Sequence, residues 1–180
     1  KVLLVCGMDR FGMAEALENT GCDLVLGDLI FALGLPIPLK SLKSLYIIAS
    51  IIAPIACRLP ISLLYPTEEK SEPKFERFYH EADVIAGDFH FIKQHLPKDI
   101  SGKIILTNTV TAADVDLLSK RGAKMLITTT PKLNGRSFGT NVMEGVLVSL
   151  SDKPYKSLTP DDYSQLLDKI GFLPRIEVLN

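Results

Sequence analysis

The stretch VLLVCGMDRFGM, residues 2–13, combines three features that set the expectations for the rest of the chain. It begins with a run of apolar residues, which is typical of a parallel strand covered on both faces. A turn with the spacing G-x-D-x-x-G follows, formed by Gly7, Asp9 and Gly12, and then a helix-forming run. A strand, a glycine-containing turn and a helix in this order predict an α/β fold with a ligand at the first turn.

The remainder of the sequence continues this alternation. Apolar runs predict further strands at residues 23–27, 84–87, 103–109 and 124–130. Helical spacing and capping residues predict helices at residues 13–20, 39–57, 89–96, 112–120, 140–150 and 159–171. The charged stretch 67–82 is expected to begin as a surface connection and to end as a helix. This alternation predicts a Rossmann-like three-layer sandwich around a mainly parallel sheet of about five strands.

Composition, net charge and cysteine spacing indicate the domain organisation, the partners and the compartment of this chain. No internal repeat or flexible linker divides the 180 residues, so we expect a single nucleotide-binding domain over residues 1–180. Lys1 is not an initiator methionine and opens directly into a strand, which favours the C-terminal part of a longer protein. A formal net charge of -1 leaves no basic excess for nucleic acid. The cysteines Cys6, Cys22 and Cys57 lack metal-ligand spacing, which favours a reducing cytoplasmic compartment and no bound metal.

The apolar segment 45–64 raises the question of a membrane. A spanning helix needs about 20 apolar residues, and Pro54, Arg58 and Pro60 interrupt this segment near its centre. A buried or interface helix is therefore favoured over a membrane contact. If the helix lies at the surface, the same segment predicts a homo-oligomer.

Polar residues follow each predicted strand, and the carboxyl ends of parallel strands meet at one edge of a sheet, where ligands bind. The first two ends carry Arg10 beside the glycines and Asp28, which lies 21 positions after Gly7. An acid at that distance is where a Rossmann domain binds the adenosine ribose, and it favours NAD over NADP. An aspartate that caps a turn is the alternative. The later strand ends add Gly87, Asp88, Asn108 and Thr109 to the expected cofactor site.

Asp9 departs from the usual glycine of a phosphate loop. Its charge would repel a diphosphate, so the loop is either an atypical dinucleotide loop, a loop for a nucleoside or sugar, or a site that has lost its function. The favoured interpretation has the Asp9 side chain capping the following helix while Arg10 faces the ligand.

Two further groups are candidates for chemistry. Asp88 and His90 follow the third strand, where a histidine can act as an acid or base, although a packed helix residue is the alternative. Arg136, Ser137 and Thr140 lie where a polar loop enters a helix, an arrangement that suits an anion or substrate. An ordinary capped loop is the alternative there.

Several blocks of this sequence together resemble a known family. These blocks are VLLVCGMDRFGMAEALE, GDLIFALGLPIPLKSLKSL, LPISLLYPT, ADVIAGDFHFIKQHLP and GRSFGTNVMEGVLVSL. They are similar to bacterial quinate or shikimate 5-dehydrogenase-like proteins, whose Rossmann domain is related to those of shikimate dehydrogenase and glutamyl-tRNA reductase. The resemblance implies that Gly7, Asp9, Arg10 and Gly12 form the cofactor loop and that Gly87 and Asp88 line the cofactor groove.

Two function classes follow. The resemblance implies the NAD(P)-binding domain of a dehydrogenase acting on a CH-OH group, with the catalytic and substrate residues in an N-terminal domain outside this sequence. The alternative is a domain that binds a nucleotide or another anionic metabolite without chemistry, as a sensor or scaffold. Both classes imply a small-molecule ligand, with no membrane or nucleic acid as partner.

Overall fold

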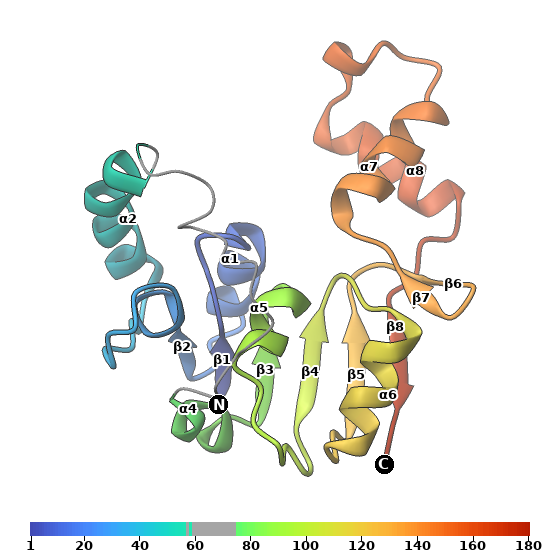
Figure 1. Ribbon diagram of the computed structural model, residues 1–180. Coiled ribbons are helices and arrows are strands. Elements are labelled where there is room, and N and C mark those ends of the chain that lie inside the picture. The colour runs from blue at the N-terminus through green and yellow to red at the C-terminus, as the bar shows by residue number, and fades with distance from the viewer. Residues whose placement is uncertain (57, 59–74) are drawn as a thin grey trace.

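The computed structural model describes residues 1–56, 58 and 75–180. Its centre is a six-stranded sheet with the strand order β2-β1-β3-β4-β5-β8 (Figure 1). The strands span Val2–Leu4 (β1), Leu24–Leu26 (β2), Val84–Ala86 (β3), Ile104–Thr107 (β4), Met125–Thr128 (β5) and Arg175–Val178 (β8). The first five run parallel, as the buried apolar runs predict, and β8 pairs antiparallel with β5. The expected α/β class and Rossmann-like architecture are confirmed.

Helices cover both faces of the sheet. On one face, α4 (Glu76–Glu81), α5 (Phe89–Gln94) and α6 (Ala112–Lys120) enclose a core around Tyr79, Ile85 and Ile105. On the other face, α1 (Phe11–Asn19) and α2 (Leu42–Ala56) cover β1, β2 and β3 through Ala14 and Leu45. Among the described residues, α7 (Thr140–Ser149) and α8 (Pro160–Lys169), with a short 3-10 helix at Tyr155–Ser157 between them in the sequence, stand beyond the carboxyl ends of β4 and β5 (Figure 1).

The strand order reverses between β1 and β3. From β1 the chain moves outward to β2, then returns across to β3 on the other side of β1 and continues to β4 and β5. At such a switch point the loops after the two central strands diverge to opposite faces and leave a crevice where ligands bind. Here those loops begin at Val5 and Gly87, so the order supports a site at their carboxyl ends.

Local sequence signals account for the starts of α6 and α8. Thr111 and Asp114 form the expected capping box, in which each side chain accepts a hydrogen bond from the other's backbone N-H. At α8, Thr159 is the N-cap and Pro160 opens the helix, as its sequence predicts. Thr159 also forms a capping box with Asp162, in which the backbone N-H of each residue donates a hydrogen bond to the side chain of the other.

Four elements differ from the sequence-based expectation. The sheet has a sixth strand, β8, after the last predicted helix, where the sequence patterns predicted no strand. The polar loop 131–139 contains a short hairpin of β6 (Lys132–Leu133) and β7 (Arg136–Ser137). Residues Asp28–Ala32 form one π-helical turn directly after β2. A single-residue bridge joins Val110 to Ser137 and ties the hairpin to the loop after β4.

Residues 45–56 of the apolar segment lie in α2, which spans Leu42–Ala56. Within the described ranges, no helix is long and apolar enough to cross a membrane. Leu45 is buried against the sheet, whereas Tyr46, Ile47 and Ile51 are exposed. The predicted features at Cys57 and Pro60, and the start of the charged stretch at residue 67, lie outside the described residues.

Candidate functional site

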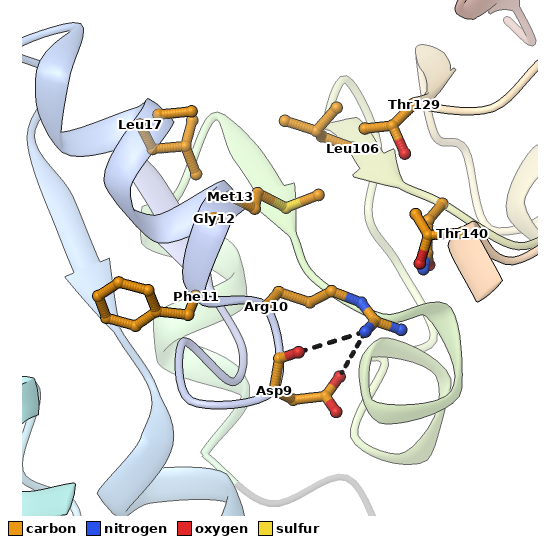
Figure 2. Close-up of a pocket in the computed structure, with 11 residues that line it drawn as sticks. Asp9, Arg10, Phe11, Gly12, Met13, Leu17, Leu106, Thr129 and Thr140 are labelled. Atoms are coloured by element: carbon orange, nitrogen blue, oxygen red, sulfur yellow. Dashed lines mark hydrogen bonds and ion pairs between the residues drawn. The ribbon is translucent and has the colours of Figure 1, made fainter. Parts of the chain in front are cut away.

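A cavity of about 530 Å³ lies at the carboxyl edge of the sheet, beside the switch point. Met13 and Leu17 on α1 face Leu106, Thr129 and Thr140 across it (Figure 2). Its lining comes from α1 and the turn before it, the ends of β4 and β5, and the start of α7: Asp9, Arg10, Phe11, Gly12, Met13, Ala16, Leu17, Leu106, Asn108, Thr129 and Thr140. The volume is within the range of small-molecule pockets.

The start of α1 supplies the polar end of the cavity. Among the described residues, no side chain caps this helix, so the N-H groups of its first turn remain available to a ligand. A Cβ added to Gly12 would meet no atom within 4 Å, which leaves open space beside the helix start. The expectation that Asp9 caps α1 is therefore wrong.

Arg10 extends from this turn toward Thr140 (Figure 2). Its Nη2 donates a hydrogen bond to Oδ2 of Asp88 at 2.5 Å, and its Nη1 lies 3.5 Å from Oδ2 of Asp9. The Arg10–Asp88 pair spans the switch point, because the two residues follow β1 and β3. Arg10 Nε is buried and has no hydrogen-bond partner in the described part of the chain. One guanidinium thus lies between two carboxylates at the cavity.

Asp9 has an unfavourable electrostatic environment. Burial, together with the charges of Asp88 and Asp28, raises the pKa of Asp9, while Arg10 acts in the opposite direction. A ligand phosphate placed at the start of α1 would meet this carboxylate at close range.

Asp28 faces the β1–α1 turn and does not line the cavity. Its carboxylate is 4% exposed and accepts hydrogen bonds from the backbone N-H groups of Gly7 and Met8 at 3.0 and 2.8 Å. A Cβ added to Gly7 would lie 3.2 Å from Oδ2 of Asp28 and 3.0 Å from Leu45. In this geometry Gly7 makes room for an internal carboxylate, and Asp28 holds the turn together.

Cys6 adds to this cluster without being reactive. Its Sγ donates a hydrogen bond to Asp28 at 3.5 Å. Burial, and after it the charge of Asp28, raises the pKa of the Cys6 thiol to about 12. The thiol therefore stays protonated at neutral pH, and it is a poor nucleophile.

Asn108 is the most buried of the described residues that line the cavity, at 1% exposure. It follows β4 directly, and its backbone carbonyl accepts a hydrogen bond from Thr130 Oγ1 at 2.6 Å. Neither atom of its side-chain amide has a hydrogen-bond partner among the described residues. Thr109, its neighbour, packs against the start of α7, where a Cβ on Gly139 would lie 3.2 Å from Thr109 Oγ1.

The three candidate residues of the loop 134–141 lie in three different environments in the structure. Thr140 lines the cavity at the start of α7, a helix that no described side chain caps. Ser137 is fully buried and bonds Thr128 Oγ1 at 2.9 Å, so it connects the hairpin to β5. Arg136 is exposed and stacks on the ring of Phe138 with 4.6 Å between the guanidinium carbon and the ring centroid.

The candidates at the third strand end serve helix α5. Asp88 is its N-cap and accepts a hydrogen bond from His90 N at 2.9 Å, while the exposed His90 does not line the cavity. Gly87 adopts a φ of 137°, which a residue with a side chain rarely adopts. No group of His, Cys, Asp and Glu suited to a metal ion occurs in the described ranges.

Sequence reasoning missed the apolar wall of the cavity. Met13, Ala16 and Leu17 share one face of α1, and Leu106 faces them from β4. Their helical spacing was a usable signal, but it predicts burial against a sheet equally well.

The strand order and the cavity beside its switch point define an α/β protein of Rossmann-like fold. Over residues 1–179 the chain matches the family described as Domain of unknown function (DUF8754), and it belongs to that family. No curated protein and no solved structure matches the chain.

Proposed function

We propose that this chain is the NAD(P)-binding domain of a quinate/shikimate dehydrogenase-like oxidoreductase and that the cavity holds the nicotinamide half of the cofactor. The observation that carries the proposal is the position of the cavity, at the carboxyl edge of a doubly wound sheet next to its switch point. The uncapped start of α1 opens into it and offers N-H groups to a phosphate. Met13 and Leu106 offer apolar surface to a flat ring.

The structure gives less support for binding of the adenosine half of the cofactor. Asp28 is engaged by Gly7 and Met8, so its use as a ribose ligand, and the preference for NAD that depends on it, stay predictions without support from this geometry. The proposal therefore assigns most of the binding energy to the nicotinamide mononucleotide half. Hydride chemistry belongs to the cofactor, and we expect the groups that act on the substrate to come from another domain.

Calorimetric titration with NAD, NADP and their reduced forms tests the proposal. We expect binding, and we expect nicotinamide mononucleotide to bind more tightly than ADP-ribose because the cavity lies on the β4 side of the switch point. Ala16→Phe fills the cavity from the surface of α1 and should weaken binding at least tenfold. Glu15→Phe, an exposed neighbour outside the cavity, is the matched control. Equal binding by both variants would contradict the assignment.

A second candidate is a domain that binds a metabolite without chemistry. The carboxylates of Asp9 and Asp88 around Arg10 favour it, because they oppose the phosphates of a dinucleotide. Under this alternative none of the four dinucleotides binds, and Asp9→Asn does not restore binding. If electrostatic repulsion alone limits a dinucleotide, Asp9→Asn should instead tighten its binding.

A further inference from the structure

The amide of Asn108 stands out among the buried polar groups at this edge of the sheet. Thr128, Thr130 and Ser137 are equally buried, and each of their hydroxyl groups has a hydrogen-bond partner. Asn108 buries a donor and an acceptor, and neither has a partner among the described residues. Thr107 Oγ1 is also unpaired within the described chain, but Thr107 does not line the cavity.

An unpaired buried amide lowers the stability of a folded protein. Burying a polar group without a hydrogen bond costs free energy, and an amide presents both a donor and an acceptor to be satisfied. Backbone bonding does not explain the residue type, because the Asn108 contact with Thr130 uses the main-chain carbonyl that every residue has. A ligand in the cavity can supply the missing partners.

We propose that Asn108 is a specificity-determining residue that recognises a planar amide group on the ligand through hydrogen bonds. A carboxamide offers an acceptor beside a donor and can bond both atoms of the Asn108 amide at once. A carboxylate offers only acceptors, and an ammonium group only donors, so each leaves one atom of Asn108 unpaired. The apolar side chains of Met13 and Leu106 line the same cavity and suit the ring that carries the amide. The inference rests on the proposed function, because it needs a ligand in this cavity.

The test compares nicotinamide mononucleotide with nicotinic acid mononucleotide by calorimetry. The two share ribose and phosphate, so the difference reports the exchange of a neutral amide for a charged carboxylate, and the Asn108 variant shows how much of it depends on that residue. Wild-type protein should bind the amide at least tenfold more tightly. In Asn108→Leu, which removes both polar atoms, the preference should fall to near one. Asn134→Asp, on the exposed β6–β7 turn, is the control and should keep the wild-type preference.

The melting temperature without ligand separates a binding role from a structural one. If the amide serves a ligand, Asn108→Leu should melt at or above the wild-type temperature. A lower melting temperature with an unchanged preference would overturn the inference and leave the proposed function intact. If neither mononucleotide binds the wild type, the nicotinamide proposal fails. In that case the melting temperature of Asn108→Leu alone tests the role of Asn108. A melting temperature below that of the wild type would count against the inference, and one above it would support the inference.

Uridine monophosphate identifies the source of the amide. It carries a cyclic amide on the same ribose phosphate. Binding that is lost in Asn108→Leu would support the inference and move the ligand from nicotinamide to a pyrimidine. Binding of both nucleotides that survives Asn108→Leu would overturn it.

Discussion

Asp28 and the turn after β1 form a unit at the scale of single residues. The carboxylate lies among the N-H groups of Gly7 and Met8 and the thiol of Cys6, with little access to solvent. Hydrogen bonds to a charged acceptor are stronger than those between neutral groups. The same bonds occupy N-H groups that a phosphate loop would offer to its ligand. Asp28 therefore stabilises the turn and limits what the turn can bind.

Replacing Asp28 with asparagine tests this role. Asparagine has one acceptor atom in place of two, and its NH₂ group would face a backbone donor. We expect the free energy of unfolding to fall by about 2 kcal/mol, measured by urea denaturation. Asp23→Asn, an exposed carboxylate just before β2, should change little. Wild-type stability combined with loss of NAD binding would instead support the ribose role.

At the scale of elements, the two helices that border the cavity differ from α6 and α8 in how their N-termini are capped. The starts of α6 and α8 are closed by capping boxes, and both lie away from the cavity. Those of α1 and α7 have no side-chain cap from any described residue, and both border it. Closed helix ends contribute to stability, whereas open ones leave donors for a ligand.

The cap of α8 has a pH dependence that can be measured. Lys153, and after it Thr159, holds the pKa of Asp162 at about 2, below its ordinary value. A lowered pKa stabilises the folded form above the ordinary value, and this contribution is lost as the pH falls from about 4 toward 2. The protection factors of the amides in α8, which compare their exchange with that of an unfolded chain at the same pH, should therefore fall over that range.

Thr159→Ala should raise exchange in α8 at neutral pH by an amount equivalent to about 1 kcal/mol. It should also flatten the acid dependence, because Asp162 loses one of the groups that bond it. Thr159→Ser keeps the hydroxyl and serves as the control. Identical exchange in all three proteins would show that the box contributes nothing to α8.

At the scale of the whole molecule, two of the apolar surfaces that the described residues leave exposed can be compared directly. One is the outer face of α2, where Tyr46, Ile47 and Ile51 are each more than half exposed. The other is the outer part of the sheet face that α1 and α2 leave open, where Ile176 and Val178 on β8 are 65% and 68% exposed. Exposed apolar patches of this kind often mark association sites.

We predict that the α2 face mediates self-association. Ile47 and Ile51 lie one helical turn apart, so together they form a continuous stripe. Sedimentation at increasing concentration should show a dimer that Ile47→Glu combined with Ile51→Glu dissociates. The matched pair Ile176→Glu and Val178→Glu should leave it intact. Dissociation only by the β8 pair would move the interface to the sheet, and a wild-type monomer at all concentrations would remove it.

Much of this fold follows from local sequence patterns. The buried parallel strands are continuous apolar runs, and the ends of α6 and α8 have strong capping residues, so both could be predicted within a few residues. Strand β8 could not, because the four residues RIEV have an alternating pattern that any exposed connection can show. Its place in the sheet depends on pairing with β5, which lies far away in the sequence.

The candidate site also has one part that the sequence predicts and another that it does not. Its position at the strand ends, with Arg10, Asn108 and Thr140, follows from the sequence alone, because parallel strands bring their carboxyl ends to one edge. The direction of each side chain was decided only by the tertiary structure. Asp28 faces the turn, Ser137 faces β5, and the apolar wall forms because α1 lies opposite β4. A pattern in sequence specifies which residues reach the edge, whereas packing between distant segments determines which of them meet a ligand.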